Sequence, residues 1–448
     1  MCSKPFSPDF AWGVATASYQ IEGAFDQDGR GETIWDRFCT VPGNVLQRDD
    51  GKVACDHYNR YKEDVALMKE LGVKAYRFSI AWSRIYPKGR GEINRKGLEF
   101  YSNLVDELLA AGIEPYITLY HWDLPQALQD IGGWANPETA RYFLAYSKTV
   151  LDALGAKVKK WITLNEPYCA AFLGNYEGRQ APGIRDFSTA VRVAYFMYVG
   201  HGLVVDYFRN SGIDGEIGIA LNLMGRFPLR DTPEDKLASK RADGYLNRWF
   251  IDPIICGKYP EDMIELYRSN GVVLPEFHDE DLSLISQKLD FIGLNYYNDF
   301  WVKADSECWP LGFSIVNPKY VPINDRGWPV TESGLTAMLL RLKEEYGVEK
   351  IYITENGTSL PDVVSLDGRV EDGARKDYLH RHISAMHDAI EKGVNVKGYF
   401  QWSLYDNFEW GFGFSSRFGI VHVDFASQKR TVKDSGIWYS KVIENNSI

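Results

Sequence analysis

Eight short strand-like runs, most of them followed by a helix-like run, limit the folds open to this chain more than any other feature. The runs are rich in β-branched, aromatic and other apolar residues. Between them, apolar residues recur at spacings of three and four, as in Tyr58, Tyr61, Val65, Met68 and Leu71. Strand followed by helix, repeated in this way, predicts a parallel sheet. The eight runs are 10–17, 75–80, 114–120, 160–165, 216–223, 290–297, 351–355 and 396–403.

Eight such units are the number that closes a parallel sheet into a (β/α)8 barrel. No linker rich in Pro, Gly or Ser divides the 448 residues. We therefore predict the α/β class and a single (β/α)8 TIM barrel domain spanning residues 1–448, with long βα loops. The stretches 26–55 and 302–329 lack a clear pattern and are predicted to be large loops over one end of the barrel. A doubly wound open sheet is the alternative fold.

Charge and composition narrow the class of partner. The net charge is −11, from 50 basic and 61 acidic residues, which argues against nucleic acid. No apolar run is long enough to cross a bilayer, so no membrane partner is expected. The first residues show no segment of signal-peptide type, which favours a cytoplasmic protein. The six cysteines include no CxxC pair and are expected to be reduced. The oligomeric state stays open, a homo-oligomer included.

Two of the predicted strands end on a carboxylate. Glu355 ends the run that starts at Ile351, and Glu166 directly follows the run 160–165. A carboxylate at the end of a buried apolar strand is costly to remove from water unless it has partners or a task. The active site of such a barrel lies at the carboxyl ends of its strands, and hydrolysis of a glycosidic bond requires two carboxyl groups.

Six stretches, spread along the whole chain, carry a resemblance to a known family. The chain resembles the family 1 glycoside hydrolases, the β-glucosidase and β-galactosidase family. The resemblance implies a single-domain barrel, hydrolysis with retention of anomeric configuration, and no metal or organic cofactor. The matching stretches, in the family's order, are 10–23, 76–79, 119–125, 163–167, 353–357 and 407–410.

The resemblance implies that Glu166 is the acid/base and Glu355 the nucleophile. Arg77 and the hydroxyl of Tyr297 are expected to keep Glu355 ionised, with Asn165 and Asn295 as further supports. A second negative charge beside Glu355 is unfavourable, which favours a protonated Glu166. A retaining enzyme needs the two carboxyl groups roughly 5–5.5 Å apart.

Sugar-binding residues are also implied by the resemblance. Hydrogen bonds to the hydroxyls of the terminal sugar are expected from Gln20, His121, Asn165, Glu409 and Trp410. Trp402 is expected to form the floor under the sugar ring, and Trp122 and Phe418 to line the same pocket. On the leaving-group side, Trp328 is expected at the lip. Tyr168 stands where many relatives have Trp, so the leaving-group preference cannot be copied from the family. His121 has no second histidine at ligand spacing, which argues against a metal site.

The substrate class predicted from these residues is the unphosphorylated β-glucosides, namely cellobiose, short cello-oligosaccharides and aryl β-glucosides. The carboxylate of Glu409 should repel a phosphate on the sugar, and Glu166 excludes the resembling thioglucosidases, which have glutamine there. A β-galactosidase or β-fucosidase of broad specificity is the alternative within the family. A catalytically silent sugar-binding barrel and a metal-dependent hydrolase are the alternatives from other classes.

Overall fold

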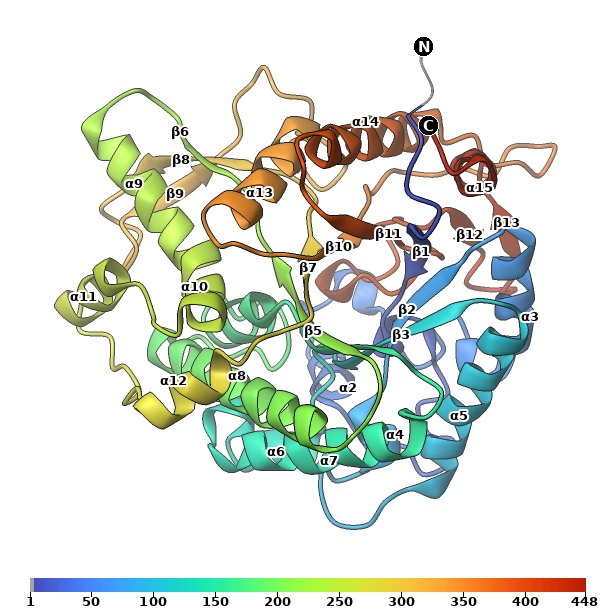
Figure 1. Cartoon of the computed structure of the whole chain (residues 1–448), viewed down its shortest axis with the longest axis horizontal. Coiled ribbons are helices and arrows are strands. Elements are labelled where there is room, and N and C mark those ends of the chain that lie inside the picture. Colours follow the sequence, from blue (N-terminus) through green and yellow to red (C-terminus); the bar gives the residue numbers. More distant parts are fainter. Residues whose placement is uncertain (1–3) are drawn as a thin grey trace.

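The computed structural model describes residues 4–448, and its centre is a closed barrel of eight parallel strands (Figure 1). Around the barrel the strands follow the order β1-β11-β10-β7-β5-β4-β3-β2. The predicted barrel is confirmed, and the alternative of an open doubly wound sheet is wrong. Each predicted run overlaps one barrel strand: β1 (Ala11–Ala15), β2 (Ala75–Ser79), β3 (Glu114–Tyr120), β4 (Lys160–Asn165), β5 (Glu216–Asn222), β7 (Phe291–Asn295), β10 (Ile351–Asn356) and β11 (Val396–Trp402).

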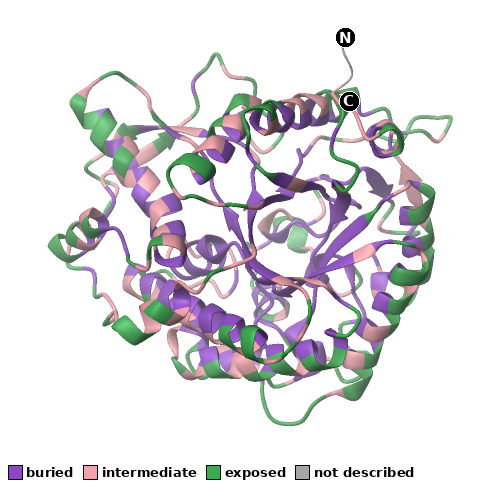
Figure 2. Cartoon of the chain, in the orientation of Figure 1, coloured by how far each residue is buried: buried purple, intermediate pink, exposed green. Residues whose placement is uncertain are grey.

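The barrel strands are buried on both faces, as Figure 2 shows by their purple colour. Every residue of β2, β7 and β10 is buried. This is the pattern of a parallel sheet that is covered by helices outside and filled by side chains inside. Aromatic rings fill part of the interior, where Tyr116 lies 4.7 Å from Phe400 and 5.5 Å from Tyr352 between ring centroids.

Helices surround the barrel and cover its outer face (Figure 1). The predicted apolar faces lie on α3 and α5, and Gly72 and Gly112, just past those helices, have φ of 73° and 75°. Pro137 is the N-cap of α7, and Asn136 Oδ1, one residue before it, accepts from the Glu138 N–H at 3.0 Å. The longer helices are α3 (His57–Glu70), α5 (Arg95–Ala110), α7 (Glu138–Leu154), α8 (Phe187–Asn210), α9 (Pro233–Asp243), α10 (Trp249–Cys256), α11 (Glu261–Ser269), α12 (Asp279–Ile285), α13 (Glu332–Glu344), α14 (Gly373–Glu391) and α15 (Asp434–Asn445).

The loops between strands and helices contain short elements that periodicity did not reveal. Residues 26–55 include α2 and η1, and residues 302–329 include β9, which forms a three-stranded sheet in the order β6-β8-β9. These elements are too short to show a repeat in the sequence. They are α1 (Ser18–Ile21), α2 (Ile34–Cys39), η1 (Leu46–Arg48), α4 (Trp82–Ile85), α6 (Gln126–Gln129), η2 (Gly133–Ala135), η3 (Cys169–Leu173), β6 (Arg226–Pro228), η4 (Gly244–Arg248), β8 (Phe300–Ala304), β9 (Phe313–Val316), η5 (Trp410–Phe412), β12 (Val421–Val423) and β13 (Arg430–Val432).

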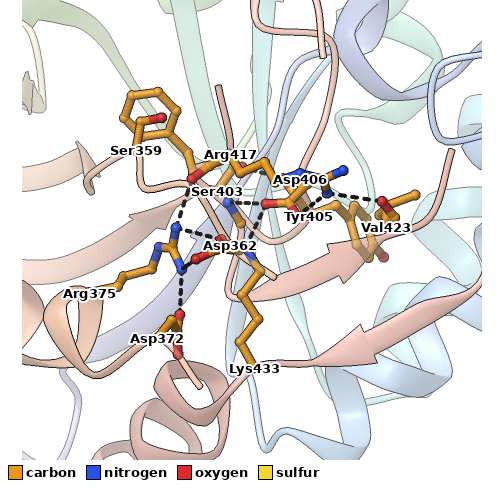
Figure 3. Close-up of polar contacts among 12 residues, drawn as sticks. Ser359, Asp362, Asp372, Arg375, Ser403, Tyr405, Asp406, Arg417, Val423 and Lys433 are labelled. Atoms are coloured by element: carbon orange, nitrogen blue, oxygen red, sulfur yellow. Dashed lines mark hydrogen bonds and ion pairs between the residues drawn. The ribbon is translucent and has the colours of Figure 1, made fainter. Parts of the chain in front are cut away.

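A buried ionic cluster ties together the segments that follow β10 and β11 (Figure 3). Lys433 Nζ donates to Asp406 Oδ1 at 2.7 Å and also contacts Asp362. Arg375, at the start of α14, pairs with Asp362 at 2.8 Å and with Asp372. Arg417 pairs with Asp406 at 2.7 Å. We call these six residues the ionic cluster: Asp362, Asp372, Arg375, Asp406, Arg417 and Lys433.

The described ends of the chain meet on the outside of the barrel (Figure 1). The Lys4 N–H donates to the Ile448 carbonyl at 3.1 Å, and Pro5 forms an isolated bridge with Ser447.

Within residues 4–448, no helix combines the length and apolar character needed to span a membrane. Cys2 lies outside the described residues, and the five cysteines inside them are free thiols, as predicted.

Candidate active site

Glu166 and Glu355 lie in one cavity of about 230 Å³. Glu355 is the fifth residue of β10, and Glu166 directly follows β4. The cavity brings together most of the residues that the sequence predicted for the site. The predicted residues that line it are His121, Trp122, Glu166, Tyr168, Tyr297, Trp328, Glu355, Trp402, Glu409, Trp410 and Phe418. The remaining four, Gln20, Arg77, Asn165 and Asn295, are buried and hydrogen-bond to lining residues.

Glu355 is held by a cation and a hydroxyl. Arg77 Nη1 donates to its Oε1 at 2.7 Å, and the Tyr297 hydroxyl donates to its Oε2 at 2.6 Å. Burial raises the pKa of Glu355, while Arg77 and Tyr297 oppose this by stabilising the carboxylate. The ion pair with Arg77 therefore favours an ionised Glu355, and this residue lines the cavity.

Glu166 has two hydrogen-bond donors but no cation of its own. Asn295 Nδ2 donates to its Oε1 at 2.7 Å, and the Cys169 thiol donates to its Oε2 at 3.0 Å. Burial, followed by the negative charge of Glu355, raises the pKa of Glu166 to about 8. At neutral pH Glu166 therefore holds a proton while Glu355 is paired with a cation. One cavity thus contains a proton donor and a carboxylate nucleophile.

A chain of amides fixes the orientation of both carboxyl groups. Thr354 donates to Asn295 Oδ1 at 2.6 Å, which turns Nδ2 of Asn295 toward Glu166. The same Nδ2 lies 3.0 Å from Asn165 Oδ1, which also accepts from Arg77 at 2.6 Å. Arg77 thus connects the residues that hold Glu166 and Glu355 into one hydrogen-bond network. Removing a residue that holds one of these carboxyl groups would therefore also disturb the other.

Two of the residues expected to bind the sugar each have a buried polar atom without a partner among residues 4–448. These atoms are Gln20 Oε1 and His121 Nδ1. Burial, and then the charge of Arg77, lowers the pKa of His121 well below its usual range, so its ring is neutral. Asn165 Nδ2 lies 3.0 Å from His121 Nε2, which leaves Nδ1 as the donor of the ring. An unpaired acceptor and an unpaired donor are what a hydroxyl-rich ligand would satisfy.

Aromatic rings form the wall of the same end of the cavity. Trp402 and Trp410 both lie nearly parallel to the His121 ring, with centroids 5.8 and 5.9 Å away. Trp122 packs against Trp410 at 4.7 Å, and its indole N–H donates to the Asn165 carbonyl. On the opposite wall, Tyr168 packs edge-on against Tyr245 at 5.4 Å.

Arg326 is a residue that the sequence reasoning missed. Its Nη1 donates to Glu409 Oε1 at 2.9 Å, and its guanidinium lies 4.3 Å from the Trp328 ring centroid. It falls within the stretch that showed no pattern, 83 positions from Glu409, so no local signal could have paired the two. The pair makes the pocket beside Glu409 nearly neutral. Arg326 therefore offsets part of the repulsion expected between Glu409 and a phosphate on the sugar.

Trp328, which was expected at the lip on the leaving-group side, lines the cavity. Its ring packs 5.6 Å from Tyr297 and 6.1 Å from Phe418, the residue expected to line the sugar pocket. Trp328 therefore lies next to the expected sugar pocket. Its contact with Arg326 also places it beside Glu409.

Three cavity residues adopt left-handed backbone conformations that non-glycine residues rarely adopt. Their φ values are 73° for Trp122, 43° for Glu166 and 54° for Trp410. Such backbone costs about 1–3 kcal/mol per residue and is retained where surrounding structure enforces it, commonly at active sites. Trp122 and Glu166 lie just past the ends of β3 and β4, Trp410 begins η5, and all three residues line the cavity. Among residues 4–448, no group of three or more His, Cys, Asp or Glu side chains is arranged to hold a metal ion.

Comparison with known proteins relates this site to characterised relatives. The family model described as glycosyl hydrolase family 1 matches residues 2–448. The chain is 47% identical over 448 residues to β-glucosidase A of Acetivibrio thermocellus, covering 100% of both chains, and 49% identical over 447 residues to β-glucosidase A of Thermotoga maritima, covering 99% of both. The crystallised T. maritima family 1 β-glucosidase in complex with isofagomine lactam superposes with a TM-score of 0.96 at 49% identity, covering 100% of both chains. This chain belongs to glycosyl hydrolase family 1.

Proposed function

We propose that the protein is a retaining, exo-acting β-glucosidase. It removes terminal non-reducing β-D-glucosyl residues from cellobiose, cello-oligosaccharides and aryl β-glucosides. The observation that carries the proposal is the unequal pair in one cavity: Glu355 beside Arg77, and Glu166 with a pKa of about 8. The names of its relatives, β-glucosidase A among them, support the same assignment.

The first step forms a covalent intermediate. A carboxylate oxygen of Glu355 attacks the anomeric carbon of the sugar, while Glu166 gives its proton to the glycosidic oxygen. The bond between the anomeric carbon and that oxygen breaks, and the leaving group departs as an alcohol. Glu355 is now a neutral ester, so the charge that raised the pKa of Glu166 has gone.

The second step releases the sugar with its original configuration. Glu166, now a carboxylate, takes a proton from water as the water oxygen attacks the anomeric carbon. The ester bond breaks, Glu355 regains its negative charge, and Glu166 holds a proton again. Arg77, Asn165, Asn295 and Tyr297 keep both carboxyl groups in position throughout. Neither step calls for a metal or an organic cofactor.

The sugar occupies the end of the cavity near β1 and β11. Gln20, His121, Asn165, Glu409 and Trp410 bind its hydroxyls, and Trp402 stacks beneath its ring. Trp122 and Phe418 complete this pocket, and Trp328 and Tyr168 extend it toward the leaving group. Gln20 and Glu409 are buried, so this end is closed and holds one terminal sugar, which accounts for exo action.

The proposal includes the setting of the enzyme. One catalytic domain spans residues 1–448 and acts in the cytoplasm on small-molecule β-glucosides and short oligosaccharides, with neither nucleic acid nor membrane as a partner. The closed barrel, which takes its strands from nearly the whole chain, supports the single domain. The net charge of −11 supports the absence of a nucleic-acid partner.

Initial rates on three substrates test this function, with EDTA present. They are 4-nitrophenyl β-D-glucoside, 4-nitrophenyl β-D-galactoside and 4-nitrophenyl β-D-glucoside 6-phosphate. We expect turnover of the glucoside and none of the phosphate. A faster rate on the galactoside would replace glucosidase by galactosidase, and turnover of the phosphate alone would overturn the account of the pocket around Glu409 and Arg326. Folded protein without activity on any substrate would favour a silent sugar-binding barrel.

A further inference from the structure

Arg226, the first residue of β6, is a buried arginine on the cavity wall that lacks a protein partner. Only 8% of the residue is exposed, and its Nε and Nη1 have no hydrogen-bond partner among residues 4–448. The neighbouring carboxylate of Asp299 instead accepts from the Gly225 N–H at 2.7 Å. The guanidinium lies 4.9 Å from the centroid of the Phe300 ring. Arg226 thus lines the cavity, and no hydrogen bond from these two nitrogens to residues 4–448 fixes its guanidinium.

An unpaired buried cation is costly, which makes this arrangement informative. Burial lowers the pKa of Arg226 to about 10, so the side chain is still charged at neutral pH. Buried charges in proteins are otherwise paired, because removing an ion from water is expensive. The other two arginines of the cavity follow that rule, since Arg179 pairs with Glu177 at 2.6 Å and Arg326 with Glu409 at 2.9 Å.

The position of Arg226 in the barrel places it on the side of the cavity where the leaving group would lie. It follows β5, which lies four strands from β1 in either direction around the barrel. The proposed sugar pocket is on the β1 and β11 side, and the two carboxyl groups come from β4 and β10 between these sides. A group bonded to the sugar through the glycosidic oxygen therefore extends toward Arg226. On this side the cavity is lined by apolar residues, such as Met224 and Phe300, and by the polar residues Asn222 and Asn298, while the carboxylate of Asp299 lies near the guanidinium.

We propose that Arg226 binds a carboxylate on the leaving group. The enzyme then prefers β-glucosides whose leaving group carries a free carboxylate, such as a hydroxyaryl acid or a sugar acid. This inference rests on the proposed β-glucosidase function. A guanidinium binds a carboxylate through two parallel N–H donors. A single negative charge could pair directly with Arg226, to which the nearby Asp299 makes no hydrogen bond among residues 4–448, whereas a phosphate dianion would leave an excess negative charge facing Glu355.

A matched pair of substrates tests the inference: 3-carboxyphenyl β-D-glucoside and its neutral analogue 3-carbamoylphenyl β-D-glucoside. The ratio of their kcat/KM values is measured in the wild type, in Arg226→Gln and in the control Arg230→Gln, whose side chain is exposed and pairs with Asp235. Comparing ratios between variants removes the difference in leaving-group reactivity. We expect the ratio to fall by about tenfold to 100-fold in Arg226→Gln, as for loss of a charge-assisted hydrogen bond, and to stay constant in Arg230→Gln. An unchanged ratio in Arg226→Gln would overturn the inference.

A second measurement uses the wild type alone and does not depend on the folding of a variant. Benzoate and benzamide are compared as inhibitors of 4-nitrophenyl β-D-glucoside hydrolysis. Benzoate should bind about tenfold more tightly, and equal inhibition would contradict a carboxylate site. Hydrolysis of the neutral 4-nitrophenyl β-D-glucoside also separates the two proposals. If this substrate is not hydrolysed, the β-glucosidase function fails. If it is hydrolysed while both comparisons show no preference for the anion, only the role of Arg226 fails.

Discussion

The two cavity carboxylates and the ionic cluster are both removed from water, yet their charges are balanced differently. Glu166 and Glu355 share one cation, Arg77, and burial with mutual repulsion raises the pKa of Glu166 to about 8. Burial would likewise raise the pKa of Asp406, but Lys433, Arg417 and Arg375 together lower it. The difference shows that the number of cations within reach, more than burial, decides whether a buried carboxyl group keeps a proton.

The two sets of carboxylates differ in role: the cavity pair is arranged for chemistry, whereas the ionic cluster holds segments of the chain in place. The cluster holds three carboxylates against three cations and joins the segments after β10 and β11 to the C-terminal part of the chain (Figure 3). Those segments carry Glu409, Trp410 and Phe418. Beside Glu166 the charge of Glu355 raises its pKa more than Arg77 lowers it, which leaves a proton where a glycosidic oxygen can receive it.

The largest expected effect is the loss of hydrolysis in Glu355→Gly. Removing the nucleophile should lower kcat by about 10⁴-fold or more on 4-nitrophenyl β-D-glucoside. The space left should still allow transfer of glucose from α-glucosyl fluoride to an acceptor sugar, because that donor already has the configuration of the intermediate. The exposed Glu349→Gly serves as control for loss of a carboxylate. A folded Glu355→Gly protein that neither hydrolyses nor transfers would remove Glu355 from the role of nucleophile.

Glu166→Ala should show a smaller effect that depends on the leaving group. Substrates that need protonation, such as cellobiose, should lose about 10²- to 10⁴-fold in rate, the usual contribution of a general acid. Substrates with activated leaving groups, such as 2,4-dinitrophenyl β-D-glucoside, should lose far less in glycosylation. Azide should restore part of the rate by replacing water in the second step. Equal losses on both kinds of substrate would show that Glu166 is not the acid.

The ionic cluster should respond in stability. Lys433→Met leaves Asp362 and Asp406 buried with fewer partners, and we expect it to lower the free energy of unfolding by about 3–5 kcal/mol. The measurement is urea-induced unfolding at pH 7. As a control, Lys288→Met breaks a solvent-exposed pair with Glu349 and should cost less than about 1 kcal/mol. Equal losses in the two variants would mean that the cluster does not differ from a surface pair.

The smallest effect concerns the pH dependence of kcat/KM. Glu166 must be protonated to act, so activity should be present below pH 8 and fall as the pH rises through about 8. Cys169→Ala removes a hydrogen bond that stabilises the carboxylate form of Glu166, so the pKa of Glu166 should rise. The alkaline limb of the pH profile, where activity falls, should then move to higher pH by less than about one unit. Cys169→Ser should move it back. A limb that moves downward, or one that Ser does not restore, would contradict a role for the thiol.

Prediction from sequence succeeded where a local pattern carried the information. The alternation of residues such as Ile351 and Ile353 with Tyr352 and Thr354 predicted β10, and the carboxylate at its end pointed to the site. The pairs Arg326–Glu409 and Lys433–Asp362 join positions 83 and 71 residues apart. Their contacts depend on the paths of loops, which leave no periodicity in the sequence. Arg226 was not predicted as a site residue for the same reason, because β6 has only three residues and shows no periodicity.

Trapping the intermediate tests the central claim most directly. The protein is incubated with 2-deoxy-2-fluoro-β-D-glucosyl fluoride, which forms the glycosyl-enzyme readily but releases it slowly, and is then digested for mass spectrometry. We expect one sugar per chain, attached to Glu355 in the peptide that contains residues 351–356. A label on Glu166, Glu409 or another residue would contradict the assignment. Turnover of glucosides without any covalent label would contradict the two-step retaining mechanism itself.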